Sequence, residues 1–559
     1  MSYEAFSLES CARGSRPYLE QAIDTHGLPY FDVFYSVPAV AAHDWPDYGD
    51  VMARQYQAAI MYRAMTGETL ATETIWRRNL LALLSPDDGL LYRPATNYST
   101  HVADLGDQSL TLYAFATAQL AEPCAESERA VTGMVRGLAR RQDEIVATPM
   151  GFLLKSLLAA ERAVPGCGAL ELAHPLVRAL VASPGVCPPD GHYVPLTHMH
   201  GTLRALAGLA DYAHLTADEA LMARVHALYA VLRATGTAFG FIPEAVDRPG
   251  DIVTCETCAL MDYAGLGVTL ANAGYDDCWA DMERLMRNQL YESQARDLSW
   301  LSTDDERADT DQFTWRCLRQ RLIGSWAGWS SPTHFLGAEE TLNHHWGGPE
   351  LRDKPRLLQN CCGGSGVHAL FILWKNAVRV SNDAISVNLH IDRRTPEVQV
   401  LSDAPYRGHL AVTLRRPAAL RIRLPEWLRE DDRLRLSRDG AVLPWRREGL
   451  YLDAGPQPAG SRVTLDYPLP HRTEAVTIGN PGHQQYAYRV AWKGDTVTAI
   501  EPASQMPGMG YSDFDEKPVR VYFGEEGPGR LYQREAYLSD ETPHHAQPHE
   551  DHLSALNLW

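Results

Sequence analysis

The feature that most restricts the fold is a series of paired helical segments in the first half of the chain. Apolar residues recur at helical spacing in one stretch after another, at 50–66, 70–84, 107–121, 126–143, 151–164, 170–183, 200–214, 216–235, 257–273 and 277–293. Each pair spans roughly 40 to 50 residues, which is the length of a helical repeat unit. Helical hairpins at this period predict either an open α-solenoid or a closed ring of helix pairs.

The pattern changes at about Val378. From there apolar and polar residues alternate in short runs divided by Gly, Pro and Asp, which is typical of antiparallel strands in a β-sandwich. We therefore expect an entry segment over 1–48, a helical domain over 49–377, a β-sandwich over 378–475, and further strands with a polar C-terminal tail over 476–559. The histidine-rich part of that tail, 542–552, is predicted to be solvated.

Charge and hydropathy exclude several partners. With 51 basic and 70 acidic residues, the net charge is -19, which argues against nucleic acid or an anionic membrane as a partner. No stretch approaches the ~20 consecutive apolar residues of a membrane span. The N-terminus lacks a basic region followed by an apolar run, so a cytoplasmic protein with reduced cysteines is the simplest expectation. The sequence does not determine the oligomeric state, and a homodimer is one of the states it allows.

Four of the ten cysteines lie in two short clusters, Cys255-Glu256-Thr257-Cys258 and Cys361-Cys362. Thiolates with a nearby carboxylate are ligands that Zn²⁺ favours, so these clusters predict a zinc site, either structural or catalytic. Unlinked thiols are one alternative. A disulfide is the weaker one, because nothing in the sequence indicates secretion.

The two clusters resemble those of the zinc-dependent β-L-arabinofuranosidases of glycoside hydrolase family 127. In that family a carboxylate and three cysteines hold zinc, and the first cysteine of the adjacent pair is the nucleophile. The resemblance implies that Zn²⁺ is held by Glu256, Cys258, Cys361 and Cys362, with Cys361 as the nucleophile. Cys255 lies outside the family's pattern.

The resemblance extends over about residues 200–475. It includes strand phrases such as Val387-Asn388-Leu389, which are similar to those of the family's β-sandwich. It implies a multidomain α+β protein, with a closed (α/α)6 barrel followed by an antiparallel β-sandwich. Motif-bearing loops at hairpin ends agree with a closed barrel, because such a ring brings them to one mouth.

A glycosidase also needs a proton donor for the leaving oxygen, usually a carboxyl group. Glu244, in Pro-Glu-Ala, resembles the family's acid/base segment; a salt-bridging glutamate is the alternative. His200, in His-Gly-Thr-Leu-Arg-Ala, resembles a sugar-contacting histidine of the family; the alternative is a packed core histidine. His198 is expected to be structural.

Further substrate contacts are less clear in the sequence. The family's two other sugar-contacting histidines have no evident match, and Gln108 and Met150 stand where they would be expected. Trp45 is a candidate for stacking on a sugar, with a packing role as the alternative. His345 lies in an irregular, aromatic segment, 297–360, that we expect to wall the pocket. This departure from the family leaves the sugar itself undetermined.

Together these residues predict a retaining glycoside hydrolase acting on a carbohydrate with a terminal sugar such as β-L-arabinofuranoside. Cys361 would be its nucleophile and Glu244 its acid/base. Two other readings stay open. One is a zinc-stabilised carbohydrate-binding or scaffold protein without turnover. The other is a carboxylate-dependent hydrolase or lyase on the same barrel, for which Asp304, Asp305 and Glu306 are candidates.

Overall fold

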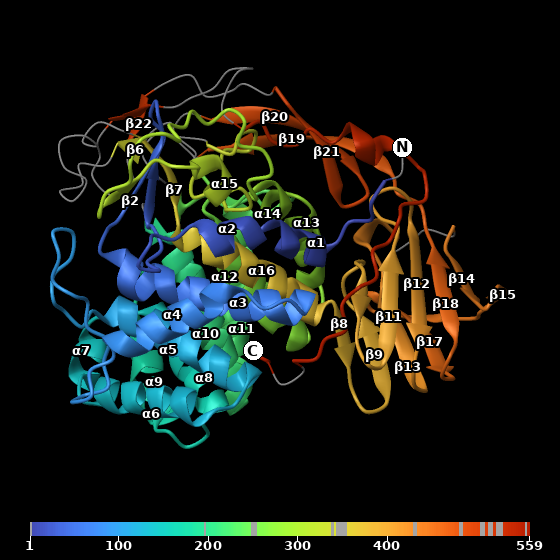
Figure 1. Ribbon diagram of the computed structural model, residues 1–559. Helices are drawn as coiled ribbons and strands as arrows, with labels where there is room; N and C mark the ends of the chain where they lie inside the picture. The colour runs from blue at the N-terminus through green and yellow to red at the C-terminus, as the bar shows by residue number, and fades with distance from the viewer. Residues whose placement is uncertain are drawn as a thin grey trace.

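Six long helices form a closed ring at the centre of the first domain. Figure 1 shows this helical domain beside the strand-rich second domain. The structure is a computed structural model and describes residues 3–194, 197–246, 254–336, 340–341, 355–428, 433–479, 485–502, 509–511, 518–520, 529–553 and 556–558. Within these residues the ring consists of α3 (Met52–Thr66), α5 (Leu105–Ala121), α8 (Gly151–Ala163), α10 (Met199–Thr216), α12 (Thr257–Asn272) and α16 (Cys361–Asn376). Each helix packs against the next and α16 packs against α3, so the ring closes.

A second layer of helices covers this ring. Each outer helix packs on an inner one, and the outer layer consists of α4 (Ala71–Leu83), α6 (Ala125–Ala139), α9 (Ala169–Ala182), α11 (Glu219–Thr235), α13 (Cys278–Arg287) and, over α16 and α3, α1 (Leu8–Gly14). In α12 every residue from Thr257 to Ala271 is buried, whereas α6 buries one face. A helix that is buried all round needs neighbours on every side, which a closed double ring supplies. The predicted (α/α)6 barrel is therefore confirmed, and the open solenoid is excluded.

Short helices complete the barrel and its loops. They are α2 (Arg16–Gln21), the π-helix η1 (Asp47–Val51), α7 (Gln142–Ala147), α14 (Gln289–Glu292) and α15 (Leu318–Leu322).

The entry segment contributes to a sheet beside the barrel mouth. The sheet has the order β5-β2-β1-β7-β6, formed by β1 (Asp32–Phe34), β2 (Val40–Ala42), β5 (Phe313–Thr314), β6 (Glu340–Thr341) and β7 (Pro355–Gln359). Asp32 of β1 pairs with Gln359, the last residue of β7. Residues far apart in the chain thus meet immediately before α16 begins.

The second domain is a β-sandwich, as predicted. One sheet has the order β10-β11-β12-β18-β14-β15 and the other β16-β17-β13-β9-β8. Their strands are β8 (Val378–Val380), β9 (Ala384–Val387), β10 (Arg393–Arg394), β11 (Val398–Ser402), β12 (His409–Leu414), β13 (Ala418–Arg423), β14 (Arg435–Arg438), β15 (Ala441–Val442), β16 (Arg446–Glu448), β17 (Tyr451–Gln457) and β18 (Arg462–Asp466). Alternate residues of β11 are buried, because successive side chains point to opposite faces of a sheet. The buried sides of both sheets form one apolar core.

A smaller sheet follows the sandwich and returns over the barrel (Figure 1). It consists of β19 (His471–Ile478), β20 (Tyr486–Lys493) and β21 (Thr496–Glu501), and β21 contacts α13. Beyond it lie a two-stranded ribbon, β22 (Met509–Tyr511) and β23 (Pro518–Arg520), and a short 3-10 turn, Glu535–Leu538. The first of these strands, β19, begins five residues before the expected boundary at residue 476.

The C-terminal tail is only partly solvated, which corrects the prediction of a solvated tail, because some of its side chains pack against both domains. The imidazole of His545 hydrogen-bonds Asp392 at 2.8 Å and Asp403 at 3.0 Å. Asp551 forms a 2.9 Å ion pair with Arg393, whose side chain is almost fully buried and needs a counter-ion. In Figure 1 the tail runs down between the barrel and the sandwich, where its charges have partners from both.

An ion-pair cluster joins the barrel to the sandwich. Glu283 of α13 pairs with Arg287 at 2.7 Å and with Arg423 of β13 at 2.9 Å, and it accepts the His390 N–H. Burial opposes the charge, but the two guanidinium groups prevail and lower the pKa of Glu283 to about 2 from its ordinary 4.5. The folded state therefore favours the ionised form of Glu283, and this ionisation stabilises the fold.

We expect Glu283→Gln to lower the free energy of unfolding by about 3–5 kcal/mol, because it leaves buried arginines without a counter-ion. A depressed pKa stabilises the fold fully above pH 4.5 and loses that effect as the pH falls toward 2. Denaturant unfolding should thus show a steeper loss of stability in this window for the wild type than for the variant. Glu448→Gln, in the exposed pair with Arg446, is the control and should change neither quantity.

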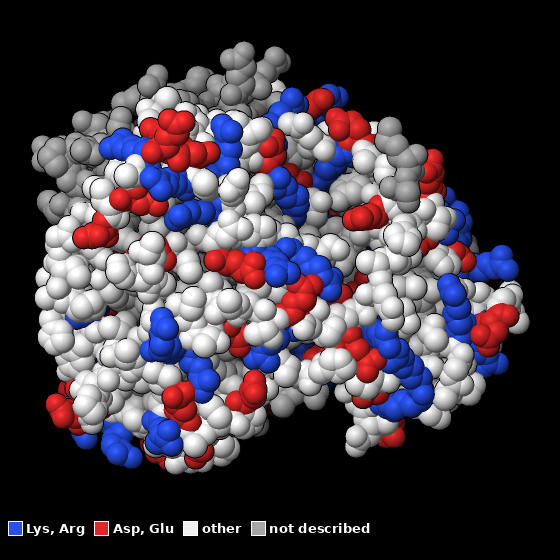
Figure 2. All heavy atoms as spheres, viewed as in Figure 1, with Lys and Arg blue, Asp and Glu red and all other residues white. Residues whose placement is uncertain are grey.

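The visible surface carries charges of both signs. On the face in Figure 2, acidic and basic side chains are interspersed over the barrel and the sandwich. No helix among the described residues combines the length and the apolar character needed to cross a lipid bilayer.

Candidate metal and acid–base site

Two helix N-termini meet at the cysteine clusters. Glu256 is the N-cap of α12 and Cys258 lies in its first turn, while Cys361 and Cys362 open α16 after the N-cap Asn360. Because α12 and α16 are neighbours in the ring, their first turns come together. A helix N-terminus carries partial positive charge, which favours thiolates there.

The four residues form a compact set of ligand atoms. The sulfurs of Cys258, Cys361 and Cys362 and a carboxylate oxygen of Glu256 all lie within 4.8 Å of one another, and all four residues are buried. The Cys258–Cys362 sulfur separation is 3.5 Å, and Glu256 Oε1 lies 3.9 Å from the Cys361 sulfur and 3.8 Å from the Cys362 sulfur. A tetrahedral zinc site with 2.3 Å Zn–S bonds has ligand separations of about 3.8 Å. These residues could therefore hold a metal ion.

Cys361 differs from the other two sulfur residues of the set. None of the three forms a disulfide. Hydrogen bonds from the Cys258 and Cys362 thiols lower the pKa of Cys361 below its ordinary value, whereas burial raises the pKa of Cys258. Cys361 is 7% exposed, while Cys258 and Cys362 are fully buried. Cys361 thus combines the most acidic thiol of the three with the largest exposed fraction.

The two glycines after the cysteine pair allow α16 to approach its neighbours. A Cβ at Gly363 would lie 1.9 Å from the Tyr18 hydroxyl, and one at Gly364 would lie 2.7 Å from the backbone of Arg54. Arg54 donates to Ser365 Oγ at 3.0 Å, and Ser365 in turn donates to the carbonyl of Cys361. Side chains at either glycine would displace these supports.

The entry segment fixes the residue before Cys361. Asn360 accepts a hydrogen bond from the Tyr18 hydroxyl at 3.1 Å and donates to the Tyr30 carbonyl at 2.6 Å. Its backbone N–H donates to the Phe31 carbonyl at 2.7 Å. Residues 1–48 therefore contribute to the site as a support for the start of α16.

A two-residue strand pair brings a second carboxylate to the cluster. β3 (Thr197–His198) pairs with β4 (Ala245–Val246), and the Met199 N–H donates to the Glu244 carbonyl at 2.7 Å. Glu244 is buried, and its Oε2 accepts the Thr254 hydroxyl at 2.9 Å. Ligand atoms of His198, Glu244 and Glu256 lie within 4.8 Å of one another. Glu244 thus adjoins the same Glu256 that contacts the sulfurs.

His200 lies in the first turn of α10, next to this group. Its Nδ1 is 2.6 Å from Asp262 Oδ2, and Arg204 binds the other oxygen of Asp262. The ring stands edge-on to Phe152 and 5.8 Å from the His198 ring. His200 is therefore held firmly beside the cluster.

The other sequence candidates lie elsewhere or differ in role. Gln108 is fully buried, and its amide accepts from and donates to the backbone of Leu91, so it is not available to a substrate. Our prediction for Gln108 is corrected on this ground. Trp45 is half-exposed, with the Arg93 guanidinium 4.0 Å above its ring centre. His345 lies outside the described residues.

The acidic run proposed for the carboxylate alternative belongs to a loop. Asp304 accepts the N–H groups of Glu306 and Arg307, and Asp305 accepts the N–H of Cys317. Such contacts cap turns. Among the described residues, the carboxylates at the cysteine cluster are instead Glu244 and Glu256.

The sequence predicts a structural role for His198, and the structure places its Nε2 atom 3.4 Å from Glu256 Oε2. The sequence did not indicate Asn360, Arg54 or Ser365 as site residues. Asn360 directly precedes the cysteine pair in the sequence, and this position could have indicated that it belongs to the site. No sequence pattern marked Arg54 or Ser365, because the contact between them depends on how α3 and α16 pack. Cys255 is buried and its backbone pairs with Ser330, outside the sulfur cluster.

A further group of possible metal ligands lies on the outer helices. It consists of His226, Asp277 and Cys278, whose ligand atoms also lie within 4.8 Å of one another. The Asp277 carboxylate is exposed and 3.8 Å from Arg233, so it already has a cationic partner.

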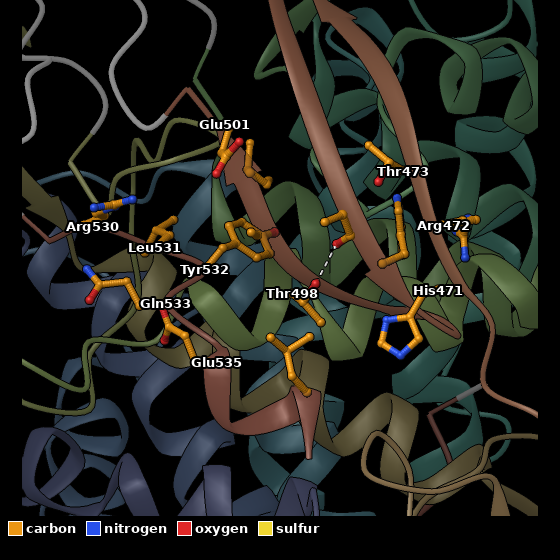
Figure 3. A pocket seen from close by; sticks show the side chains of 15 residues that line it. His471, Arg472, Thr473, Thr498, Glu501, Arg530, Leu531, Tyr532, Gln533 and Glu535 are labelled. Atoms are coloured by element: carbon orange, nitrogen blue, oxygen red, sulfur yellow. Dashed lines mark hydrogen bonds between the residues drawn. The ribbon is translucent and has the colours of Figure 1, made fainter. Parts of the chain in front are cut away.

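A separate cavity of about 560 Å³ lies on the C-terminal sheet, between β19–β21 and the segment 530–538 (Figure 3). It is lined by residues of both signs, including Arg472, Arg530, Glu501 and Glu535. The Thr498 hydroxyl in its wall donates a hydrogen bond to the Ala491 carbonyl. None of the cysteine-cluster residues lines this cavity.

Comparison with known proteins shows the fold. No protein-family model matches the sequence, and no curated protein matches it. A solved glycoside hydrolase is similar with a TM-score of 0.56 at 13% identity, covering 88% of this chain and 87% of its own. A GH127 β-L-arabinofuranosidase from Geobacillus stearothermophilus T6 has a TM-score of 0.52 at 16% identity, with 80% and 77% covered. A GH127 β-arabinofuranosidase has a TM-score of 0.56 at 14% identity, with 95% and 90% covered.

Proposed function

We propose that this protein is a retaining glycoside hydrolase that releases a terminal sugar such as β-L-arabinofuranose. One observation carries the proposal: Cys361, whose thiol pKa is lowered, lies in a buried metal-ligand cluster whose Glu256 adjoins the buried carboxyl group of Glu244. This supplies a nucleophile and a proton donor around one point. The fold shared with two β-arabinofuranosidases supports the same reading.

The metal is proposed to be Zn²⁺, held by Glu256, Cys258, Cys361 and Cys362. Three thiolates and one carboxylate oxygen suit its preference for soft ligands, and the buried Glu256 Oε2 has no hydrogen-bond partner among the described residues. Bound there, Zn²⁺ would supply the positive charge that keeps the thiols ionised at neutral pH.

In the first step Cys361 Sγ attacks the anomeric carbon. The bond from that carbon to the leaving oxygen breaks, and the Glu244 carboxylic acid gives this oxygen its proton. The product is a thioglycosyl bond between the sugar and Cys361. Arg54, through Ser365, and the braced Asn360 hold the backbone of the nucleophile in place.

In the second step a water molecule attacks the same carbon. The Glu244 carboxylate takes the water proton, the sulfur–carbon bond breaks, and Cys361 regains its thiolate. Each displacement inverts the anomeric carbon, so the released sugar retains its configuration. Both steps use the same two side chains.

The direct test is to trap the covalent sugar. A mechanism-based inhibitor built on the arabinofuranose ring should add one mass label per chain, and peptide mapping should find it on Cys361. A label on a carboxylate would overturn the thiol mechanism. A protein that stays unlabelled and turns over no aryl glycoside in a wide panel would favour the binding-protein alternative.

Glu244→Gln is expected to lower kcat by about 10²–10⁴-fold, because glutamine cannot transfer the proton. The first step should recover on substrates whose leaving group needs no protonation, and added azide should then restore turnover, since it attacks without a general base. Glu171→Gln, on the outer helix α9, is the matched control and should behave as wild type. An equal loss on all leaving groups, with no azide effect, would count against Glu244 as the acid/base.

A further inference from the structure

The carboxylate of Glu256 has two different sides. Its Oε1 faces the sulfurs of Cys361 and Cys362. Its Oε2 is buried without a hydrogen-bond partner among the described residues, and the Nε2 atom of His198 lies 3.4 Å from it. His198 is therefore the neighbour that can hold the side of Glu256 turned away from the metal ligands.

His198 is placed there by local backbone structure. It ends β3, pairs with Ala245 of β4, and is the N-cap of α10. The next residue of the chain binds the Glu244 carbonyl, so His198 and Glu244 are kept side by side. Its side chain is 39% exposed, which is more than a packing residue needs and allows it to reach the open side of the site.

We propose that His198 is a positioning residue that fixes the metal ligand Glu256 and separates it from the acid/base Glu244. This inference rests on the proposed function. Carboxylates that bind metals are usually held by a second hydrogen bond on their outer oxygen, which sets their orientation. Here the Nε2–H of His198 would donate to Glu256 Oε2 and leave Oε1 toward the sulfurs.

The same contact has a second consequence. Two carboxylates within 4.8 Å repel each other when both are charged, and Glu256 could otherwise turn toward Glu244. A hydrogen bond from His198 Nε2, which lies 3.4 Å from Glu256 Oε2, would hold Glu256 on the side of the sulfurs. The Glu256 carboxylate would then stay apart from that of Glu244, the proposed acid/base.

The test measures metal affinity on the full chain, with Zn²⁺ as the probe and a chromophoric chelator as the competitor. His198→Ala is expected to weaken Zn²⁺ binding by about 10–100-fold, the usual effect of removing such a support. It should lower kcat by a similar factor and change KM by less than about 3-fold, because the sugar is bound by other groups. In Co²⁺-loaded protein the thiolate charge-transfer bands should persist while the ligand-field bands change.

Two replacements separate positioning from simple packing. Glutamine puts its amide nitrogen close to where Nε2 of histidine lies, so His198→Gln should recover Zn²⁺ affinity to within about 3-fold of wild type. Asparagine is too short to reach Glu256, so His198→Asn should resemble alanine. His174→Ala, which removes a partly buried histidine bonded to the Tyr212 hydroxyl, is the control and should leave metal affinity unchanged.

The outcomes distinguish this inference from the proposed function. If His198→Ala binds Zn²⁺ as tightly as wild type, or if asparagine and glutamine behave alike, the role of His198 is overturned while the hydrolase proposal stands. If the expected affinity pattern is found but wild type hydrolyses no glycoside, the hydrolase proposal fails and His198 keeps its role on Glu256. A wild-type protein that takes up no metal overturns both.

Discussion

Replacement of Cys361 by serine is expected to lower kcat/KM for an aryl β-L-arabinofuranoside by at least about 10⁴-fold, the scale seen when a catalytic nucleophile is removed. A hydroxyl has a far higher pKa than a thiol, so it would stay protonated where the helix N-terminus and the neighbouring thiols favour an ionised sulfur. The measurement is steady-state kinetics, combined with the mass label described above. The variant should acquire no label.

Cys255→Ser is the matched control for this experiment. Cys255 directly precedes Glu256 in the chain and is buried, yet it lies outside the metal-ligand cluster, and its pKa is raised to about 12 by burial. The control variant should keep nearly full activity and its metal. If Cys255→Ser were as inactive as Cys361→Ser, the loss would reflect damage to the fold, and the assignment of the nucleophile would be withdrawn.

Removal of the metal by a strong chelator is expected to abolish hydrolysis and to lower thermal stability together. A ligand present at a thousand times its Kd stabilises the folded state by about 4 kcal/mol, so a site of such affinity gives a shift in melting temperature that is easily measured. Removal should also raise the reactivity of Cys361 toward a colorimetric thiol reagent, because it loses its ligand and is the only cysteine of the cluster with any exposure. Addition of Zn²⁺ should reverse all three changes.

Two controls identify the site that is responsible. Cys278→Ser alters the second group on the outer helices and should leave the chelator response unchanged, whereas Cys362→Ser should remove it. Activity that survives complete metal removal would contradict the zinc–thiolate mechanism and favour a hydrolase that uses Glu244 and Glu256 alone. Stability that falls while activity persists would indicate a purely structural metal.

The location of the C-terminal tail shows where sequence patterns lose their value. Residues 542–552 are polar and rich in histidine, which is typical of solvated segments. Their partners are Asp392, Asp403, Arg393 and Lys375, residues that only the contact between barrel and sandwich brings within reach. A polar residue that has buried partners of opposite charge cannot be told from a solvated one by composition.

Gln108 and His198 illustrate the same limit at the site. Gln108 lies where a substrate contact was expected from the sequence. Its side-chain amide instead forms two hydrogen bonds with the backbone of Leu91, one as acceptor and one as donor. His198 seemed ordinary in the sequence because its partners, Glu244 and Glu256, lie about 50 residues away. The pairing of the two-residue strands β3 and β4 brings His198 close to Glu244, and strands this short could not be predicted from the sequence.

The sequence by itself determined the fold class and indicated the four residues that could hold a metal ion. Periodicity reveals which faces must be buried, so the change from helical spacing to alternation at Val378 was enough to separate barrel from sandwich. Tertiary structure alone decided which cysteine of the cluster is least buried, that Asn360 is held by Tyr18 and Tyr30, and that His198 adjoins Glu256. The physical reason is that burial patterns are local, whereas access and hydrogen-bond partners depend on how distant helix ends pack around the ring.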